Sequence, residues 1–177
     1  MRRRLLALLL VALVSAAVAG TVASAKGRLD VGARIPALPR LQEVANICPV
    51  PLRYRPAFAR AAHDTGLPLA MLVAVGQVES NLQAGARSTA DARGLLQVLP
   101  STAAELRLDA DRPASNVLAG ARYLEQLLQR FHSTDLALAA YNAGPTAVVD
   151  AGGAPTNETV RYVANVTNFW RELRGCR

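Results

Sequence analysis

Apolar residues recur at helical spacing along most of the chain that follows residue 54. Proline at first turns and glycine after last turns divide this pattern into separate segments. Alternation of the kind that strands require is nearly absent, and no internal repeat is visible. We therefore expect a mostly α, compact helical domain, with helices over about 56–65, 68–80, 94–106 (one bent helix or two short ones), 115–131, 135–142, 145–150 and 157–173.

Two of these helices carry side chains suited to capping their first turns. Ser115 or Asn116 can cap the helix that runs to about Phe131, and Thr156 can cap the last helix. Oxygen atoms on short side chains accept hydrogen bonds from the free backbone amides of a first turn, which fixes where the helix begins.

The first 25 residues have the order of parts found in a secretory signal peptide. Three arginines, 2–4, precede an apolar run, and Ala23, Ser24 and Ala25 form a small-residue cleavage site. The alternative is an uncleaved membrane anchor, because residues 5–25 are uncharged and long enough to span a bilayer. We expect residues 1–25 to be removed on export to the periplasm, with membrane contact only if the leader stays.

Two regions are expected after the leader. Residues 26–53 are rich in proline and arginine and predict an extended lead-in segment, whereas residues 54–177 predict the folded domain. Loss of the three leader arginines lowers the formal charge from +7 to +4, which suits a polyanionic envelope. No basic run interleaved with aromatic residues is present, so we expect no nucleic-acid partner.

The chain has two cysteines, Cys48 and Cys176, near the two ends of the expected mature protein. In an oxidising compartment such a pair predicts one disulfide, and the alternative is two free thiols. Neither cysteine has a histidine nearby. No spacing matches a metal site, a phosphate-binding loop or a Ser/His/Asp arrangement, so we expect no metal and no cofactor.

One charged residue interrupts the apolar helix expected over 68–80. Glu79 is the only charged side chain between Asp64 and Arg87. A carboxyl group among apolar side chains loses solvation, which raises its pKa and favours a role as general acid. The alternative is a glutamate at a helix end that faces solvent.

Several short motifs surround Glu79 in a fixed order. Together they resemble the soluble, SLT-type lytic transglycosylase family, and they extend over most of the chain from about residue 67 to residue 166. The motifs are ESNL at 79–82 with Ser88, GLLQVLPSTA at 94–103, NVLAGARYL at 116–124, AAYNAGP at 139–145 and ETVRYV at 158–163.

The resemblance implies a lysozyme-like fold with a cleft, and peptidoglycan glycan strands as the substrate. It implies that Glu79 cleaves the β-1,4 bond between N-acetylmuramic acid and N-acetylglucosamine, leaving 1,6-anhydro ends. By fold-level analogy, the small size further suggests a secretion or conjugation machine as partner. The matching positions implied to contact substrate are Ser80, Ser88, Gln97, Tyr141, Asn142, Glu158 and Tyr162.

The chain departs from the family pattern at three positions. Leu96 replaces a usual methionine, a nearly volume-conserving change. Asp91 stands where a glycine is usual, and Val160 stands where an arginine is common.

Two other functions remain open from the sequence. A hydrolase like goose-type lysozyme would need a second carboxylate to activate water, and Asp91 is the only acid available between Glu79 and Glu105. A peptidoglycan-binding module without activity would gain nothing from a desolvated acid.

Overall fold

The computed structural model describes residues 47–176. The predicted signal peptide and most of the predicted lead-in segment lie outside these residues. In the described part the chain forms helices and no strand, as the apolar pattern predicted, and only two isolated bridges join Arg87 to Arg93 and Arg93 to Val98. In chain order the helical elements are η1 (Leu52–Tyr54), α2 (Arg55–Thr65), α3 (Leu69–Ser80), α4 (Pro100–Glu105), α5 (Pro113–Phe131), α6 (Thr134–Ala143), α7 (Pro145–Ala151) and α8 (Asn157–Glu172).

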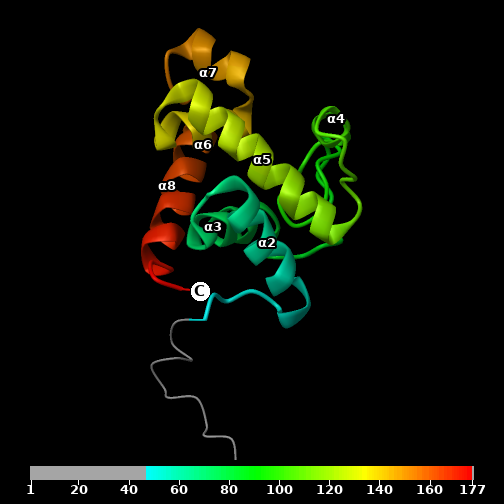
Figure 1. The fold of residues 1–177 in the computed structure, drawn as a ribbon. Coiled ribbons are helices and arrows are strands. Elements are labelled where there is room, and N and C mark those ends of the chain that lie inside the picture. The colour runs from blue at the N-terminus through cyan, green and yellow to red at the C-terminus, as the bar shows by residue number, and fades with distance from the viewer. Residues whose placement is uncertain (1–46, 177) are drawn as a thin grey trace, which may run out of the picture. The chain divides into compact units, whose positions relative to one another are not determined.

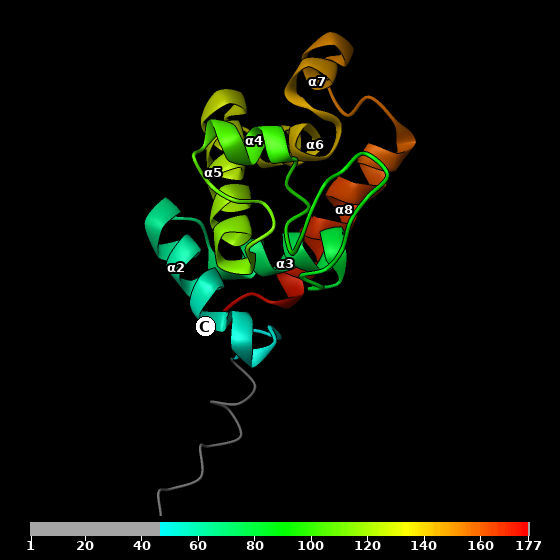
Figure 2. The same cartoon turned by 90° about the vertical axis from the view of Figure 1, so that its right-hand side faces the viewer.

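Helix α3 is the centre of the domain. Its residues 70–76 are all buried, as expected for a helix that is apolar on every side. Helix α8 packs against α3 and α6, while α5 packs against α2 and α6. In Figure 1, α3 lies between α8 on one side and the connection to α4 on the other; Figure 2 shows the same arrangement from the side. No helix within residues 47–176 is both long and apolar enough to cross a membrane.

The prediction for the start of the last helix is confirmed. The Thr156 side chain accepts a hydrogen bond from the Thr159 amide at 3.1 Å and caps α8. Glycine ends α2 at Gly66 and α7 at Gly152, each with a positive φ that an L side chain rarely adopts. The ends of α2 and α7 and the start of α8 therefore lie where the sequence predicted them.

The capping prediction for α5 is wrong. This helix begins at Pro113, whose ring fixes φ for a first turn, and neither Ser115 nor Asn116 caps it. The Ser115 hydroxyl accepts a hydrogen bond from the Asp109 amide at 2.7 Å, outside the helix. Asn116 lies inside the helix, and its side-chain amide forms hydrogen bonds with the backbone of Arg93, Leu96 and Ala110.

The helix expected over 94–106 is also shorter than predicted. Only Pro100–Glu105 is helical, and the preceding residues form a turn. Gly94 has φ +72° and Gln97 has φ +45°, and two left-handed residues three apart cannot belong to one right-handed helix. The turn brings this segment back toward the domain before α4 begins.

The predicted disulfide between Cys48 and Cys176 is present, with a Cα–Cα distance of 4.8 Å. Figure 1 shows the C-terminal end of the ribbon beside the start of the described chain. Cross-linking residues 128 positions apart restricts the unfolded chain and stabilises the fold by about 4–5 kcal/mol in the chain-entropy model.

Candidate active site

Glu79 lies in the last turn of α3 and is partly buried. Tyr162, on α8, donates a hydrogen bond from its hydroxyl to Glu79 Oε1 at 2.6 Å. The tyrosine is itself buried, with 7% of its surface exposed. The two residues are 83 positions apart in the chain, so the packing of α8 on α3 creates this contact.

The surroundings of Glu79 favour its protonated form. Burial raises its pKa from 4.5 to about 7, although the hydrogen bond from Tyr162 acts in the opposite direction. Burial, and next the charge of Glu79, raise the pKa of Tyr141 and of Tyr162 well above 10. Both tyrosines therefore keep their protons near neutral pH, when Glu79 can give up or accept one.

A pocket of about 240 Å³ lies between α5, α6 and the turn before α4. It brings together three of the residues that the sequence predicted, Gln97, Tyr141 and Asn142. The rings of Tyr123 and Tyr141 pack with centroids 5.4 Å apart. Tyr123 was not predicted for the site, although it belongs to the NVLAGARYL motif and could have been found there. The complete lining is Gln97, Val98, Leu99, Thr102, Tyr123, Tyr141, Asn142, Ala143 and Gly144.

The hydroxyl of Tyr141 fixes the turn that forms one wall of this pocket. It donates a hydrogen bond to the Leu96 carbonyl at 2.8 Å. Gln97 Nε2 donates to the carbonyls of Gly94 at 2.9 Å and Ala86 at 3.2 Å, so its amide nitrogen also holds the turn. These contacts arrange the wall before any substrate is bound.

Asn116 is a buried polar residue whose side chain forms hydrogen bonds with the backbone of this turn. Its Oδ1 accepts from the Leu96 amide at 2.9 Å, and its Nδ2 donates to the carbonyls of Arg93 at 2.7 Å and Ala110 at 2.9 Å. A Cβ at Gly94 would approach the Asn116 amide group to 2.7 Å, so only glycine fits there. The sequence pointed to Asn116 as a cap because an asparagine near a helix start usually has that role.

Gly120 lets α5 pack closely against both the turn, at Leu96, and α6, at Tyr141. A Cβ at this position would lie 2.6 Å from Leu96 side-chain atoms and 2.8 Å from the Tyr141 hydroxyl oxygen. Contacts this short do not occur between real atoms, so the glycine is required by the close packing of three elements.

Three other predicted site residues have different surroundings. Ser80 donates to the Leu95 carbonyl at 2.8 Å and so ties the end of α3 to the turn. Ser88 is exposed, and its hydroxyl accepts a hydrogen bond from the Ala92 amide at 3.0 Å. Glu158 is exposed in the first turn of α8. Substrate contact by these three residues remains a prediction.

Asp91 belongs to a charged cluster at the outer edge of the loop. Its carboxylate contacts Arg93 at 2.9 Å and Arg87 at 3.2 Å, and both arginines also contact Asp111. The hydrogen bond from Arg93 is the main reason that the pKa of Asp91 lies below its usual value. Asp91 has φ +64°, so it adopts the left-handed conformation that suits the glycine usual at this position.

Metal-binding side chains are not grouped in the described part of the chain. Within residues 47–176, no three His, Cys, Asp or Glu side chains come together as a group that could hold a metal ion.

Comparison with known proteins points to one family. The model of the family described as "Transglycosylase SLT domain" matches residues 56–162, which is more than half of the chain. A membrane-bound lytic murein transglycosylase F from Alkalilimnicola ehrlichii is 33% identical over 130 residues, covering 69% of this chain and 25% of the relative.

Solved structures of two larger proteins have a similar fold. An inactive mutant of the lytic transglycosylase Slt from Pseudomonas aeruginosa aligns with a TM-score of 0.62 and 29% identity, over 72% of this chain and 25% of that one. The 70 kDa soluble lytic transglycosylase from Escherichia coli aligns with a TM-score of 0.60 and 27% identity, over 70% and 24%. The chain thus spans about a quarter of the length of these proteins.

Proposed function

Because the chain belongs to the transglycosylase SLT domain family, we propose that it is a peptidoglycan lytic transglycosylase with Glu79 as its catalytic residue. The single observation that carries the proposal is the position of the Glu79 carboxyl group, which is partly buried at the end of α3 against Tyr162, where burial raises its pKa to about 7. A carboxyl group in that state can donate a proton near neutral pH and accept one afterwards.

The reaction requires one group that acts first as acid and then as base. Protonated Glu79 gives its proton to the oxygen between N-acetylmuramic acid and N-acetylglucosamine, and the bond from C1 to that oxygen breaks. The resulting Glu79 carboxylate takes the proton from the C6 hydroxyl of the same muramic residue, whose oxygen forms a new bond to C1. No water is consumed, and Glu79 regains its starting state.

Other residues have supporting roles in this proposal. Tyr162 donates to Glu79 Oε1, orients the carboxyl group and stabilises its charged form between the two proton transfers. In the pocket, the Tyr141 hydroxyl and Gln97 Nε2 hold the turn, and we propose that the exposed amide of Asn142 and Gln97 Oε1 bind the sugar. Ser80, Ser88 and Glu158 are the further positions at which we propose contact with the glycan strand.

Hydrolysis with Asp91 as the second carboxylate is less well supported. The Asp91 carboxylate is held by Arg87 and Arg93, and its pKa is lowered by the hydrogen bond from Arg93. A carboxylate in these ion pairs is a weak base for a water molecule. The ion pairs favour a role for Asp91 in fixing the loop conformation.

The product mass tests this choice directly. Peptidoglycan digested by the exported chain is expected to yield 1,6-anhydro muropeptides, which are lighter than reducing-end products by one water. Reducing ends as the main product would contradict transglycosylation but retain a glycan-cleaving enzyme. The absence of any release, by a folded protein with an intact disulfide, would contradict enzymatic activity and favour the binding module.

We also propose that the protein acts outside the cytoplasm. The disulfide supports this proposal, because such bonds persist in oxidising compartments. Fractionation of cells that express the full chain is expected to place a form lacking residues 1–25 in the periplasm. A secretion or conjugation machine as partner remains an expectation from the family resemblance.

A further inference from the structure

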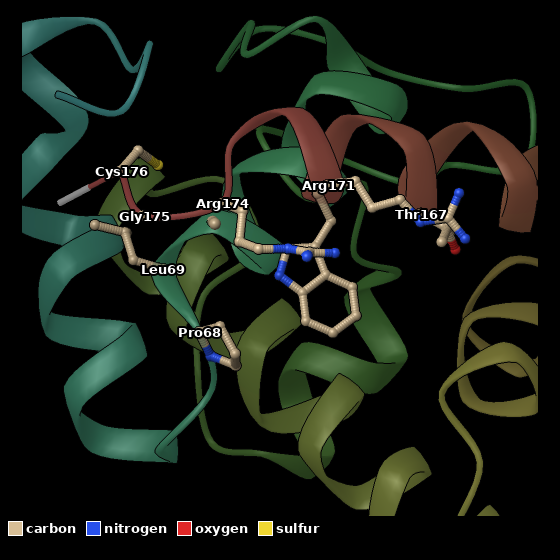
Figure 3. A pocket seen from close by; sticks show the side chains of 9 residues that line it. Pro68, Leu69, Thr167, Arg171, Arg174, Gly175 and Cys176 are labelled. Atoms are coloured by element: carbon tan, nitrogen blue, oxygen red, sulfur yellow. The ribbon is translucent and has the colours of Figure 1, made fainter. Parts of the chain in front are cut away.

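A second, larger pocket of about 530 Å³ lies at the opposite end of α3 from Glu79. The first residues of α3 form one wall and the last turn of α8 forms another, while the segment that leads to Cys176 closes the third side. Figure 3 shows these elements converging around the pocket. Its lining is Pro68, Leu69, Ala70, Thr167, Trp170, Arg171, Arg174, Gly175 and Cys176.

The lining combines apolar surface with positive charge. Arg171 and Arg174 contribute two guanidinium groups, and neither forms a salt bridge with a described residue. Among residues 47–176, no acidic side chain belongs to the lining. In Figure 3 both arginine side chains extend from the end of α8, one of them toward Thr167. Both arginines are exposed, and Arg171 also donates a hydrogen bond to Asn168 at 3.4 Å; a carboxylate is the ligand group that matches their guanidinium groups best.

A hydroxyl group on the same wall also has no partner. Thr167 Oγ1 is buried and makes no hydrogen bond to any described residue. Polar atoms in that position are usually satisfied by protein, water or ligand. The pocket thus exposes two cations and the partly buried indole ring of Trp170, while the Thr167 hydroxyl lies beneath its surface.

We propose that this pocket binds the carboxylate-bearing peptide stem of peptidoglycan. The proposal rests on the function proposed above. In a stem-bearing glycan strand the carboxylates lie on the peptide, whereas the sugars present hydroxyl and acetamido groups, so the paired arginines favour the peptide. The small apolar side chains of such a stem match the surface formed by Pro68, Leu69 and Trp170.

The separation from Glu79 is compatible with this assignment. Leu69 and Glu79 stand ten residues apart on one helix, which corresponds to about 15 Å. An extended stem of about four or five residues spans up to roughly 13–18 Å. A fully extended stem is therefore about as long as α3 from Leu69 to Glu79.

The chain contains one tryptophan, and Trp170 lines this pocket, so its fluorescence reports occupancy without any catalysis. The full chain without its leader is titrated with peptide stems released from peptidoglycan by an amidase. We expect a saturable change in emission for the wild type. In the double variant Arg171→Gln/Arg174→Gln the Kd is expected to rise about tenfold, since two charge-assisted contacts are lost.

Two controls make the result specific. Arg122→Gln, which removes an exposed arginine from α5 outside this pocket, is expected to leave the Kd unchanged. The double variant Arg171→Lys/Arg174→Lys keeps both charges and is expected to retain most of the affinity. Circular dichroism and urea unfolding establish that each variant is folded.

Three outcomes would overturn the proposal: no change in wild-type emission, an equal Kd for the Gln double variant, or an equal response to glycan fragments stripped of their stems. The last result would mark the pocket as a sugar site. The titration does not involve Glu79, so it can fail while peptidoglycan cleavage is observed, and it can succeed where cleavage fails.

Discussion

Two regions of the domain place a carboxyl group in opposite surroundings. Glu79 stands at the end of the apolar helix α3, where burial raises its pKa to about 7. Asp91 stands at the edge of the loop that follows, where its hydrogen bond with Arg93 keeps its pKa below the usual value. Within residues 47–176, the one side-chain hydrogen bond to Glu79 comes from a neutral tyrosine, whereas Asp91 is bound by two arginines.

The difference shows that the neighbours of a carboxyl group determine what it can do. A glutamate that keeps its proton near neutral pH can take part in proton transfer, whereas an aspartate held between arginines is fixed in its charged form. In the proposed function, the apolar region therefore provides the proton-transfer group, and the charged region belongs to the loop beside it. Five predictions test or refine this division.

The largest effect is expected from Glu79→Gln. Glutamine keeps the shape of the side chain but can neither donate nor accept the proton, so the rate of muropeptide release should fall by about 10³-fold or more. Chromatography of released muropeptides measures this loss. Activity close to that of the wild type would assign the proton transfers to another residue.

Asn116→Leu is expected to destabilise the turn before α4, because Asn116 hydrogen-bonds to its backbone. The change removes three hydrogen bonds and leaves the Leu96 amide and the Ala110 carbonyl without a described partner, while the Arg93 carbonyl keeps its bond from the Val98 amide at 2.9 Å. We expect a loss of about 3 kcal/mol or more in the free energy of unfolding, measured with urea. Asn165→Leu, at an exposed position on α8, is the matched control and should have little effect. Equal losses in both variants would show that the network at Asn116 adds no stability.

Glu79→Gln is also expected to increase stability at high pH. The folded protein holds the Glu79 proton up to a pH of about 7, whereas the unfolded chain releases it near 4.5, so stability of the wild type falls as the pH rises between these values. Above pH 7 the variant should be more stable by roughly 1–3 kcal/mol, and at pH 4 the two should be equal. Urea unfolding at pH 4 and 8.5 measures the difference; a constant offset would contradict the raised pKa.

Tyr162→Phe is expected to change the pH dependence as well as the rate. The hydrogen bond from Tyr162 lowers the pKa of Glu79, so its removal should move the alkaline limb of the pH–rate profile to higher pH. The loss of one hydrogen bond to a charged group should lower kcat/KM by about tenfold. A lower rate with an unchanged profile would indicate that Tyr162 only packs against α3.

The smallest effect is expected from Asp91→Asn. Asparagine accepts the left-handed conformation at φ +64° and keeps the shape of the side chain, so the loop should persist. Ion pairs that are this exposed contribute little, and activity should change by less than about threefold. A loss as large as that of Glu79→Gln would support Asp91 as a second catalytic carboxylate.

Local features of the sequence predicted most of the helices and the isolated glutamate on α3. The proline and glycine positions located most helix ends, and the isolated charge at Glu79 indicated a candidate acid, because a single charge on an apolar helix stands out. The capping role of Thr156 depends on neighbours in the sequence and was predicted correctly. These properties are fixed within a few residues along the chain.

The remainder depends on contacts between distant residues. The family motif indicated Tyr162 as a substrate-binding residue, but its contact with Glu79 was not predicted, because the sequence spacing gives no indication of it. The role of Asn116 depends on a turn about twenty residues earlier, and the Asp91 cluster includes Asp111 from another loop. Such partners become visible only when the helices have packed.

The close approach at Gly120 has a consequence for the evolution and engineering of the pocket that Gln97, Tyr141 and Asn142 line. The backbone of α5 touches Leu96 on the turn and Tyr141 on α6 at one point, so no atom can be added there without moving both. Changes in glycan specificity should therefore accumulate at outward-facing lining positions such as Leu99 and Asn142, where a new side chain meets solvent first. Glycine at position 120 therefore sets how closely α5 can approach Leu96 and Tyr141.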